Sequence, residues 1–159
     1  ALHSEGPDGS VLEVCPQGIS VAGDIAERLF RCGGAALVID YGYRKSALGD
    51  TFQALKGHTY VDPLAEPGKA DITAHIAFDQ LASAAKSRGA SSYGPAAQGT
   101  FLMSLGMGER AQQLATNADT EGQERILSEL KRLTAPDAMG TLFKVLALKD
   151  PKLPAPPGF

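Results

Sequence analysis

Apolar and polar positions alternate along the first part of the chain in a way that predicts strands and a helix. The apolar run Ala35–Asp40 is followed by Tyr41, as in a buried parallel strand that carries polar groups to the carboxyl edge of a sheet. Val11–Val14 is also strand-like, and Ile19–Arg31 has apolar residues at helical spacings of three and four. This order predicts a βαβ unit. Because ligands bind at the carboxyl edge of such sheets, the end of the run is the first place to look for a site.

The rest of the chain is mainly helical and closes with a strand. Amphipathic patterns predict helices at Phe78–Arg88, Phe101–Leu105, Glu109–Ala118 and Glu121–Leu133. Leu142–Leu148 is almost entirely apolar, which predicts a strand inside the sheet. Tyr41–Pro67 is predicted to be a long irregular stretch with strand character at Thr59–Val61, and loops of this length are usually functional. The order predicts an α/β fold with a helical insertion before the last strand.

Two details concern the helices. Thr120 and Gln123 match a capping box at the start of the last long helix. The methionines lie among leucines, which predicts that they fill the core. They are Met103, Met107 and Met139.

Composition narrows the class of protein. The 159 residues are 43% apolar and 21% charged, with a net charge of −3, which is typical of a soluble globular domain and excludes a general basic surface for nucleic acid. No apolar run approaches the length needed to span a bilayer. The two cysteines favour a reducing compartment, the cytoplasm or the mitochondrial matrix. We expect residues 1–150 to belong to one domain, followed by the Pro-rich tail Pro151–Phe159, whose prolines disfavour helix and strand.

Two constellations could carry chemistry. In one, Asp40 accepts a hydrogen bond from a ligand amine or hydroxyl while Tyr41 packs against the ligand; equally, Asp40 could cap a turn. In the other, Asp50 and Thr51 lie near His58, which could act as a general base. The alternative, a loop that satisfies its own backbone through Asp50 and Thr51, is favoured on the residues alone.

A metal site is a weaker candidate. Asp71, Thr73 and His75 alternate, so they would share one face of a strand, and His58 could join them. The chain lacks the His-x-x-x-His and Cys-x-x-Cys spacings that hold metals. The pattern favours polar capping of the following helix, and no metal is expected.

Several short motifs occur in a fixed order. They are GGAALVIDYG (33–42), GDTFQA (49–54) with His58 and DPL (62–64), PGKADITAH (67–75), QGTFL (98–102) with LG (105–106), and MGTLFKVLA (139–147). The series, over residues 11–159, resembles the C-terminal half of the MidA-like family of S-adenosylmethionine-dependent methyltransferases. The mitochondrial member of that family is a complex I assembly factor that methylates an arginine on a complex I subunit.

The resemblance implies a partial class I methyltransferase sheet, which is Rossmann-like, with an antiparallel last strand. The family's glycine-rich cofactor loop and its ribose-binding acid precede the motifs found here, so no residue is assigned to the cofactor, and this chain alone is not expected to bind S-adenosylmethionine. By position, we expect Asp40, Tyr41 and Asp50 to line the substrate side, with His58 less well placed. The family usually has Val-Asp-Phe where this chain has Ile76-Ala77-Phe78. Alanine is a poor N-cap, which costs about 1 kcal/mol.

The implied activity is methyl transfer from S-adenosylmethionine to a protein side chain, an arginine, with a respiratory complex subunit as the partner. A different class of function remains open, a non-catalytic interaction module in which the helices within 101–133 dock a partner. Apolar surface left by a missing half-sheet would also favour a homodimer. A hydrolase that uses His58 and Asp50 is weaker, because no serine or cysteine lies in an elbow-like setting.

Overall fold

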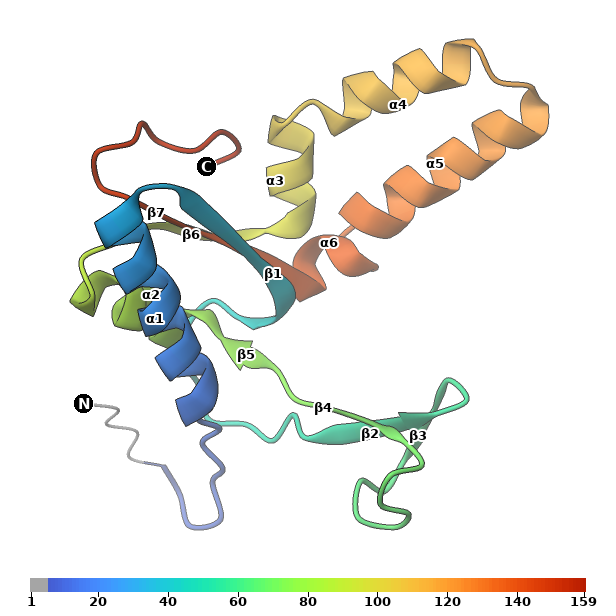
Figure 1. The fold of residues 1–159 in the computed structure, drawn as a ribbon. Coiled ribbons are helices and arrows are strands. Elements are labelled where there is room, and N and C mark those ends of the chain that lie inside the picture. The colour runs from blue at the N-terminus through green and yellow to red at the C-terminus, as the bar shows by residue number, and fades with distance from the viewer. Residues whose placement is uncertain (1–5) are drawn as a thin grey trace.

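The computed structural model describes residues 6–159, which form a main sheet, a small second sheet and a projecting pair of helices (Figure 1). The elements are α1 (Pro16–Cys32), β1 (Ala35–Tyr43), β2 (Gln53–Lys56), β3 (Thr59–Val61), β4 (Asp71–Thr73), β5 (Ile76–Ala77), α2 (Phe78–Ser87), β6 (Ser91–Ala97), α3 (Gln98–Ser104), α4 (Met107–Thr116), α5 (Thr120–Thr134), α6 (Met139–Leu142) and β7 (Phe143–Lys149). The predicted α/β fold with a helical insertion before the last strand is confirmed.

The main sheet has the strand order β5-β1-β7-β6 within the described residues. β7 pairs antiparallel with β1 from Tyr41↔Phe143 to Ala35↔Lys149, and β5 pairs parallel with the end of β1. The prediction of an interior, antiparallel last strand is confirmed, because β7 lies between two strands and Leu146 is fully buried. β6 was not predicted, since its sequence Ser-Ser-Tyr-Gly-Pro-Ala-Ala has no apolar run and its pairing with β7 is interrupted between Tyr93 and Ala96.

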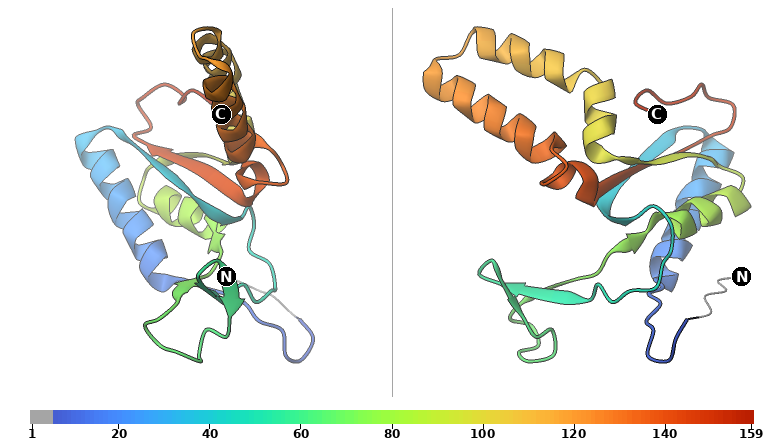
Figure 2. Two further views of the ribbon diagram at one scale, coloured as in Figure 1. Left: turned by 90° about the vertical axis from the view of Figure 1, so that its right-hand side faces the viewer. Right: turned by 180° about the vertical axis from the view of Figure 1, so that it is seen from behind.

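The core lies between this sheet and the two helices that cover one of its faces, α1 and α2 (Figure 2). Apolar side chains at helical spacing on α1 and α2 meet alternate residues of β1 and β7 there. The buried members are Ala22, Ala26, Leu29, Phe78, Leu81, Ala85, Ala90, Leu146 and Leu148. This packing fixes the position and direction of β1, whose carboxyl end carries the candidate site.

Two predictions about strands are wrong. Val11–Val14 is not a strand: it pairs with no strand, and its Val11 carbonyl instead accepts a hydrogen bond from the backbone N–H of Gly49, 2.9 Å away. No βαβ unit therefore forms around α1 within the described residues. β1 is also not buried on both faces, because α1 and α2 cover only one. Leu37 and Ile39 point away from these helices and are 50% and 45% exposed.

The helix caps give one correction and one confirmation. The N-cap of α5 is Asp119, whose carboxylate accepts from the Gly122 N–H, so the capping box predicted at Thr120 is one residue out of place. The Gln123 side chain instead donates to the carbonyls of Ala115 and Ala118. The poor cap at Ala77 is confirmed, since α2 starts there without a side-chain hydrogen bond.

A second sheet and the C-terminal tail lie at the periphery of the main sheet. β2 pairs with β3 and β4 in the second sheet, which extends away from the main sheet (Figure 1). The tail after β7 forms neither helix nor strand, and its Phe159 ring packs 5.1 Å from that of Phe101. Met103 is 47% exposed, so the prediction that it fills the core is wrong. In residues 6–159 no helix has the length and apolar character required to cross a membrane.

Candidate functional site

The carboxyl end of β1 is organised around Gly42. A methyl group on Gly42 would lie 2.1 Å from the carbonyl oxygen of Ile76, so only glycine lets β5 approach β1 this closely. The approach places His75, just before β5, against two tyrosines that share one face of β1. Its ring lies 5.7 Å from Tyr41 and 5.2 Å from Tyr43, both edge-on. The Asp-Tyr-Gly-Tyr sequence therefore builds an aromatic cluster at the sheet edge.

Hydrogen bonds from the segment before α1 hold His75 in place. The carboxylate of Glu13 accepts from both the backbone N–H of Thr51, at 2.9 Å, and its hydroxyl. The Thr51 hydroxyl oxygen in turn accepts from the backbone N–H of His75, at 2.9 Å. The three residues come from separate segments of the chain, so the network fixes the N-terminal segment and the loop after β1 relative to the sheet edge.

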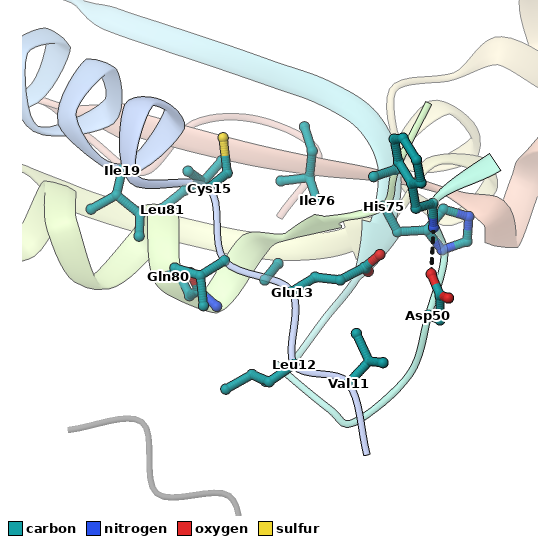
Figure 3. A pocket seen from close by; sticks show the side chains of 14 residues that line it. Val11, Leu12, Glu13, Cys15, Ile19, Asp50, His75, Ile76, Gln80 and Leu81 are labelled. Carbon is teal, nitrogen blue, oxygen red and sulfur yellow. Dashed lines mark hydrogen bonds between the residues drawn. The ribbon is translucent and has the colours of Figure 1, made fainter. Parts of the chain in front are cut away.

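A cavity of about 510 Å³ opens beside this network (Figure 3). The residues that line it come from the segment before α1, the loop around Asp50, the approach to β5 and the first turn of α2. They are Val11, Leu12, Glu13, Val14, Cys15, Ile19, Asp50, Phe52, Ala74, His75, Ile76, Ala77, Gln80 and Leu81. Most of the wall is apolar, and the acid and imidazole groups of Asp50 and His75 lie near one another at one side of it.

The structure brings together some of the residues singled out from the sequence. Asp50 lines the cavity, and one of its carboxylate oxygens accepts from the N–H of Phe52 at 3.1 Å. Tyr41 contacts His75, which lines the same cavity. Asp40 is half-buried next to Tyr41, and its carboxylate accepts from the Tyr41 N–H at 2.8 Å. This bond lies within β1, so Asp40 does not cap a turn, and the alternative role predicted for it is wrong.

His58 lies elsewhere. It occupies the turn between β2 and β3, is exposed, and has a positive φ of 64°. It lines a separate cavity of about 410 Å³ with Asp71 and Thr73, so it does not meet Asp50 at one site. Residues 6–159 contain no group of three or more His, Cys, Asp or Glu side chains that could hold a metal ion.

One cation lies near the end of β1. Lys144 of β7 is in register with Asp40, and its ammonium group donates to the backbone carbonyls of Thr141 and Leu142. Burial, and then the charge of nearby Arg44, lower the pKa of Lys144 below its ordinary value. The positive charge is therefore less favourable here than in water, although the amine remains hydrogen-bonded.

Two contacts at the site were missed from the sequence. Glu13 stands alone among apolar residues of the segment 11–15, and an acid in such a run is a signal that it has a specific partner. His75 was assigned to helix capping, whereas it packs on the tyrosines of β1. The strand predicted through Asp71, Thr73 and His75 ends at Thr73, and the alternation of these residues gives no hint of the contact between His75 and the tyrosines.

The described residues do not fit S-adenosylmethionine. β1 runs into Tyr41-Gly42-Tyr43 and a loop, not into a glycine-rich turn that opens a helix. Two polar side chains of the cavity are already engaged, Glu13 with Thr51 and Gln80 with the Ser46 hydroxyl. No residue of this chain is therefore assigned to the cofactor.

The sheet with its antiparallel strand β7, and the cavity beside β5, are those of a methyltransferase-like α/β protein. Residues 1–96 match the family model described as "Putative S-adenosyl-L-methionine-dependent methyltransferase". The chain belongs to this family.

Curated relatives cover most of the chain. It is 45% identical over 127 residues to the Drosophila melanogaster "Protein arginine methyltransferase NDUFAF7 homolog, mitochondrial". The matched residues cover 79% of this chain and 29% of the fly protein. It is 35% identical over 138 residues to the Homo sapiens "Protein arginine methyltransferase NDUFAF7, mitochondrial", covering 86% of this chain and 31% of the human protein. The chain thus spans about a third of the length of these relatives.

Two solved structures from Burkholderia thailandensis have the same fold. A COG1565 superfamily protein superposes with a TM-score of 0.83 at 25% identity, over 92% of this chain and 40% of that protein. A second COG1565 superfamily member, bound to S-adenosyl-homocysteine, superposes with a TM-score of 0.75 at 26% identity, over 89% of this chain and 38% of that protein. The main sheet and its helices are therefore those of a Rossmann-like methyltransferase.

Proposed function

We propose that the whole protein, of which this chain forms one part, transfers a methyl group from S-adenosylmethionine to an arginine of a protein substrate. The relatives named protein arginine methyltransferase support this activity, and the neighbour bound to S-adenosyl-homocysteine supports the cofactor. By the family resemblance, the substrate is a respiratory complex I subunit. The compartment is the mitochondrial matrix, as the relatives' names support, or the cytoplasm in a bacterium. Residues 1–150 form part of the methyltransferase domain and residues 151–159 its Pro-rich tail.

The observation that carries the proposal is the chemistry of the cavity beside β5. An arginine side chain has an apolar stem and a planar cationic head. The apolar wall, with Phe52 and Leu81, matches the stem, and the Asp50 carboxylate matches the head. Asp50 uses one oxygen for the Phe52 N–H, so its other oxygen can accept from a guanidinium.

The remaining candidates take different places in this proposal. Tyr41 contributes through its contact with His75, which lines the cavity. Asp40 contributes less directly, because its carboxylate is engaged by the Tyr41 N–H. His58 has the least support of the four, since it lines a different cavity.

The first test separates cofactor binding from substrate recognition. S-adenosylmethionine is titrated by calorimetry into this chain and into the full-length protein, and we expect binding by the full-length protein alone. Methyl transfer is then followed by mass spectrometry of arginines in an extract from cells that lack the gene. In full-length protein, Asp50→Asn should leave cofactor binding unchanged and reduce transfer about tenfold or more, as expected when a charge-assisted hydrogen bond is lost.

Asp62→Asn is the matched control. The Asp62 carboxylate makes the same kind of local bond, accepting from the Leu64 N–H at 2.9 Å, but it does not line the cavity. Transfer should therefore be unaffected. The proposal fails if the full-length protein binds no S-adenosylmethionine, or if the methylated residue is not arginine. Equal loss in both variants would refute the role of Asp50 alone.

A further inference from the structure

The helices α4 and α5 form an arm (residues 107–134) that projects from the main sheet in every view (Figures 1 and 2). They pack on each other and on α3, and α5 also packs on α6, through which the arm is connected to the sheet. α4 has no buried residue, and Gly122 is the only buried residue of α5. An amphipathic helix pair that buries so little leaves part of its apolar surface open to solvent.

These stripes line one groove of about 330 Å³ between the two helices. On α4 the apolar residues recur at spacings of four and three, and on α5 at a spacing of four. They are Met107, Ala111 and Leu114, and Ile126 and Leu130. Leu114 remains 44% exposed at the groove. Such a groove between two helices has the shape that accepts a third helix through its own apolar residues.

The charges at the groove select the kind of helix. Its charged lining residues are Arg110, Arg125 and Glu129. Glu129 is paired with Arg132 at 3.1 Å, whereas neither arginine of the groove forms an ion pair within the described residues. The groove is therefore locally positive on a chain whose net charge is −3. A second copy of the chain would bring the same two arginines to the same edges, which disfavours self-association there.

We propose that this groove binds an amphipathic helix of a partner protein, with apolar residues at helical spacing flanked by aspartate or glutamate. The apolar residues would fill the space beside Leu114 and Ile126, and the acids would pair with Arg110 and Arg125. This surface lies on the arm, away from the cavity beside β5, so the protein can hold a partner and present its site independently.

The probes are two designed helical peptides of about 15 residues with the same leucine stripe. One has glutamates flanking the stripe and the other has lysines. Binding to this chain is measured by fluorescence anisotropy at low and high salt. We expect the affinity for the glutamate peptide to be at least about tenfold higher than that for the lysine peptide. This difference in affinity should fall as the salt concentration rises. The double variant Arg110→Glu/Arg125→Glu should reverse the preference.

Leu114→Ser should weaken the binding of the glutamate peptide. Leu127→Ser is the control and should leave this binding unchanged. Leu127 is also an exposed leucine of the arm, at 61%, but does not line the groove. Equal binding of the two peptides, or equal effects of the two serine variants, would overturn the proposal. So would a dimer in analytical ultracentrifugation that Leu114→Ser dissociates, because a second copy would then occupy the groove. No cofactor or methyl transfer enters this test, so its result is independent of the proposed activity.

Discussion

The main sheet and the arm are held together in opposite ways. Around the sheet, Phe78, Val145, Leu146 and Leu148 are entirely removed from solvent. In the arm, α4 buries no residue at all. The sheet is therefore stabilised by tertiary packing. The arm is stabilised by its own helical hydrogen bonds, by its caps and by the contacts between its two helices. His75, whose ring contacts two tyrosines of β1, lies at the packed sheet, while the adaptable contact surface lies on the arm.

The largest expected effect comes from the packed region. Phe78 of α2 is fully buried between α1, α2 and the sheet. Phe78→Ala removes most of its ring and leaves a cavity, so we expect the free energy of unfolding to fall by about 3–5 kcal/mol. Denaturant unfolding followed by circular dichroism measures the change. Because single domains have about 5–15 kcal/mol of stability, this loss is a large share of the total and should lower the denaturant midpoint clearly.

Leu127→Ala in the arm gives the matched comparison, since this leucine is 61% exposed. Its truncation should change the free energy of unfolding by no more than about 0.5 kcal/mol. A similar loss in both variants would show that the arm contributes to the same cooperative core, and the contrast between the two regions would then be wrong.

The same contrast explains which elements could be predicted from the sequence. β1 and β7 have long apolar runs and α1 has a clear helical stripe, so their existence follows from local pattern. β6 has no such pattern. It is a strand because it pairs with β7, and this contact is not visible in its local sequence. Val11–Val14 has a strand-like composition but no strand beside it in the described residues, and pairing is what a strand requires.

The site shows the same limit. The local bonds of Asp40 and Asp50 to residues one and two positions further on could be anticipated, because short acids commonly bond their own backbone. The bonds from Thr51 to Glu13 and from His75 to Thr51 span 38 and 24 residues. No local pattern encodes such contacts, so the network that holds the site together appears only in the fold.

The second effect concerns the junction of β1 and β5. Gly42→Ala places a methyl group 2.1 Å from the Ile76 carbonyl oxygen, and the two strands must separate. We expect a loss of about 1–3 kcal/mol in the free energy of unfolding, as for other overpacked sites. Hydrogen exchange should also show faster exchange of the His75 amide, which is bonded to the Thr51 hydroxyl.

Gly49→Ala is the control for that variant. A methyl group there would come no closer than 3.6 Å to the Tyr43 hydroxyl, an ordinary contact. Both stability and the exchange of His75 should therefore stay near those of the parent protein. If the Gly42 variant behaved like this control, the close approach of β5 would not be what positions His75.

The smallest effect lies in the arm, where the cap of α5 can be removed. The Asp119 carboxylate accepts from the Gly122 N–H at 2.9 Å, so Asp119→Ala leaves that donor to water and should cost about 1 kcal/mol of helix stability. Because only Gly122 of α5 is fully buried, this loss should be local: amide exchange rises in the first turn of α5, while the midpoint of global unfolding hardly moves. A full 1 kcal/mol shift in global unfolding, with no local fraying, would mean that the arm and the sheet unfold as one unit.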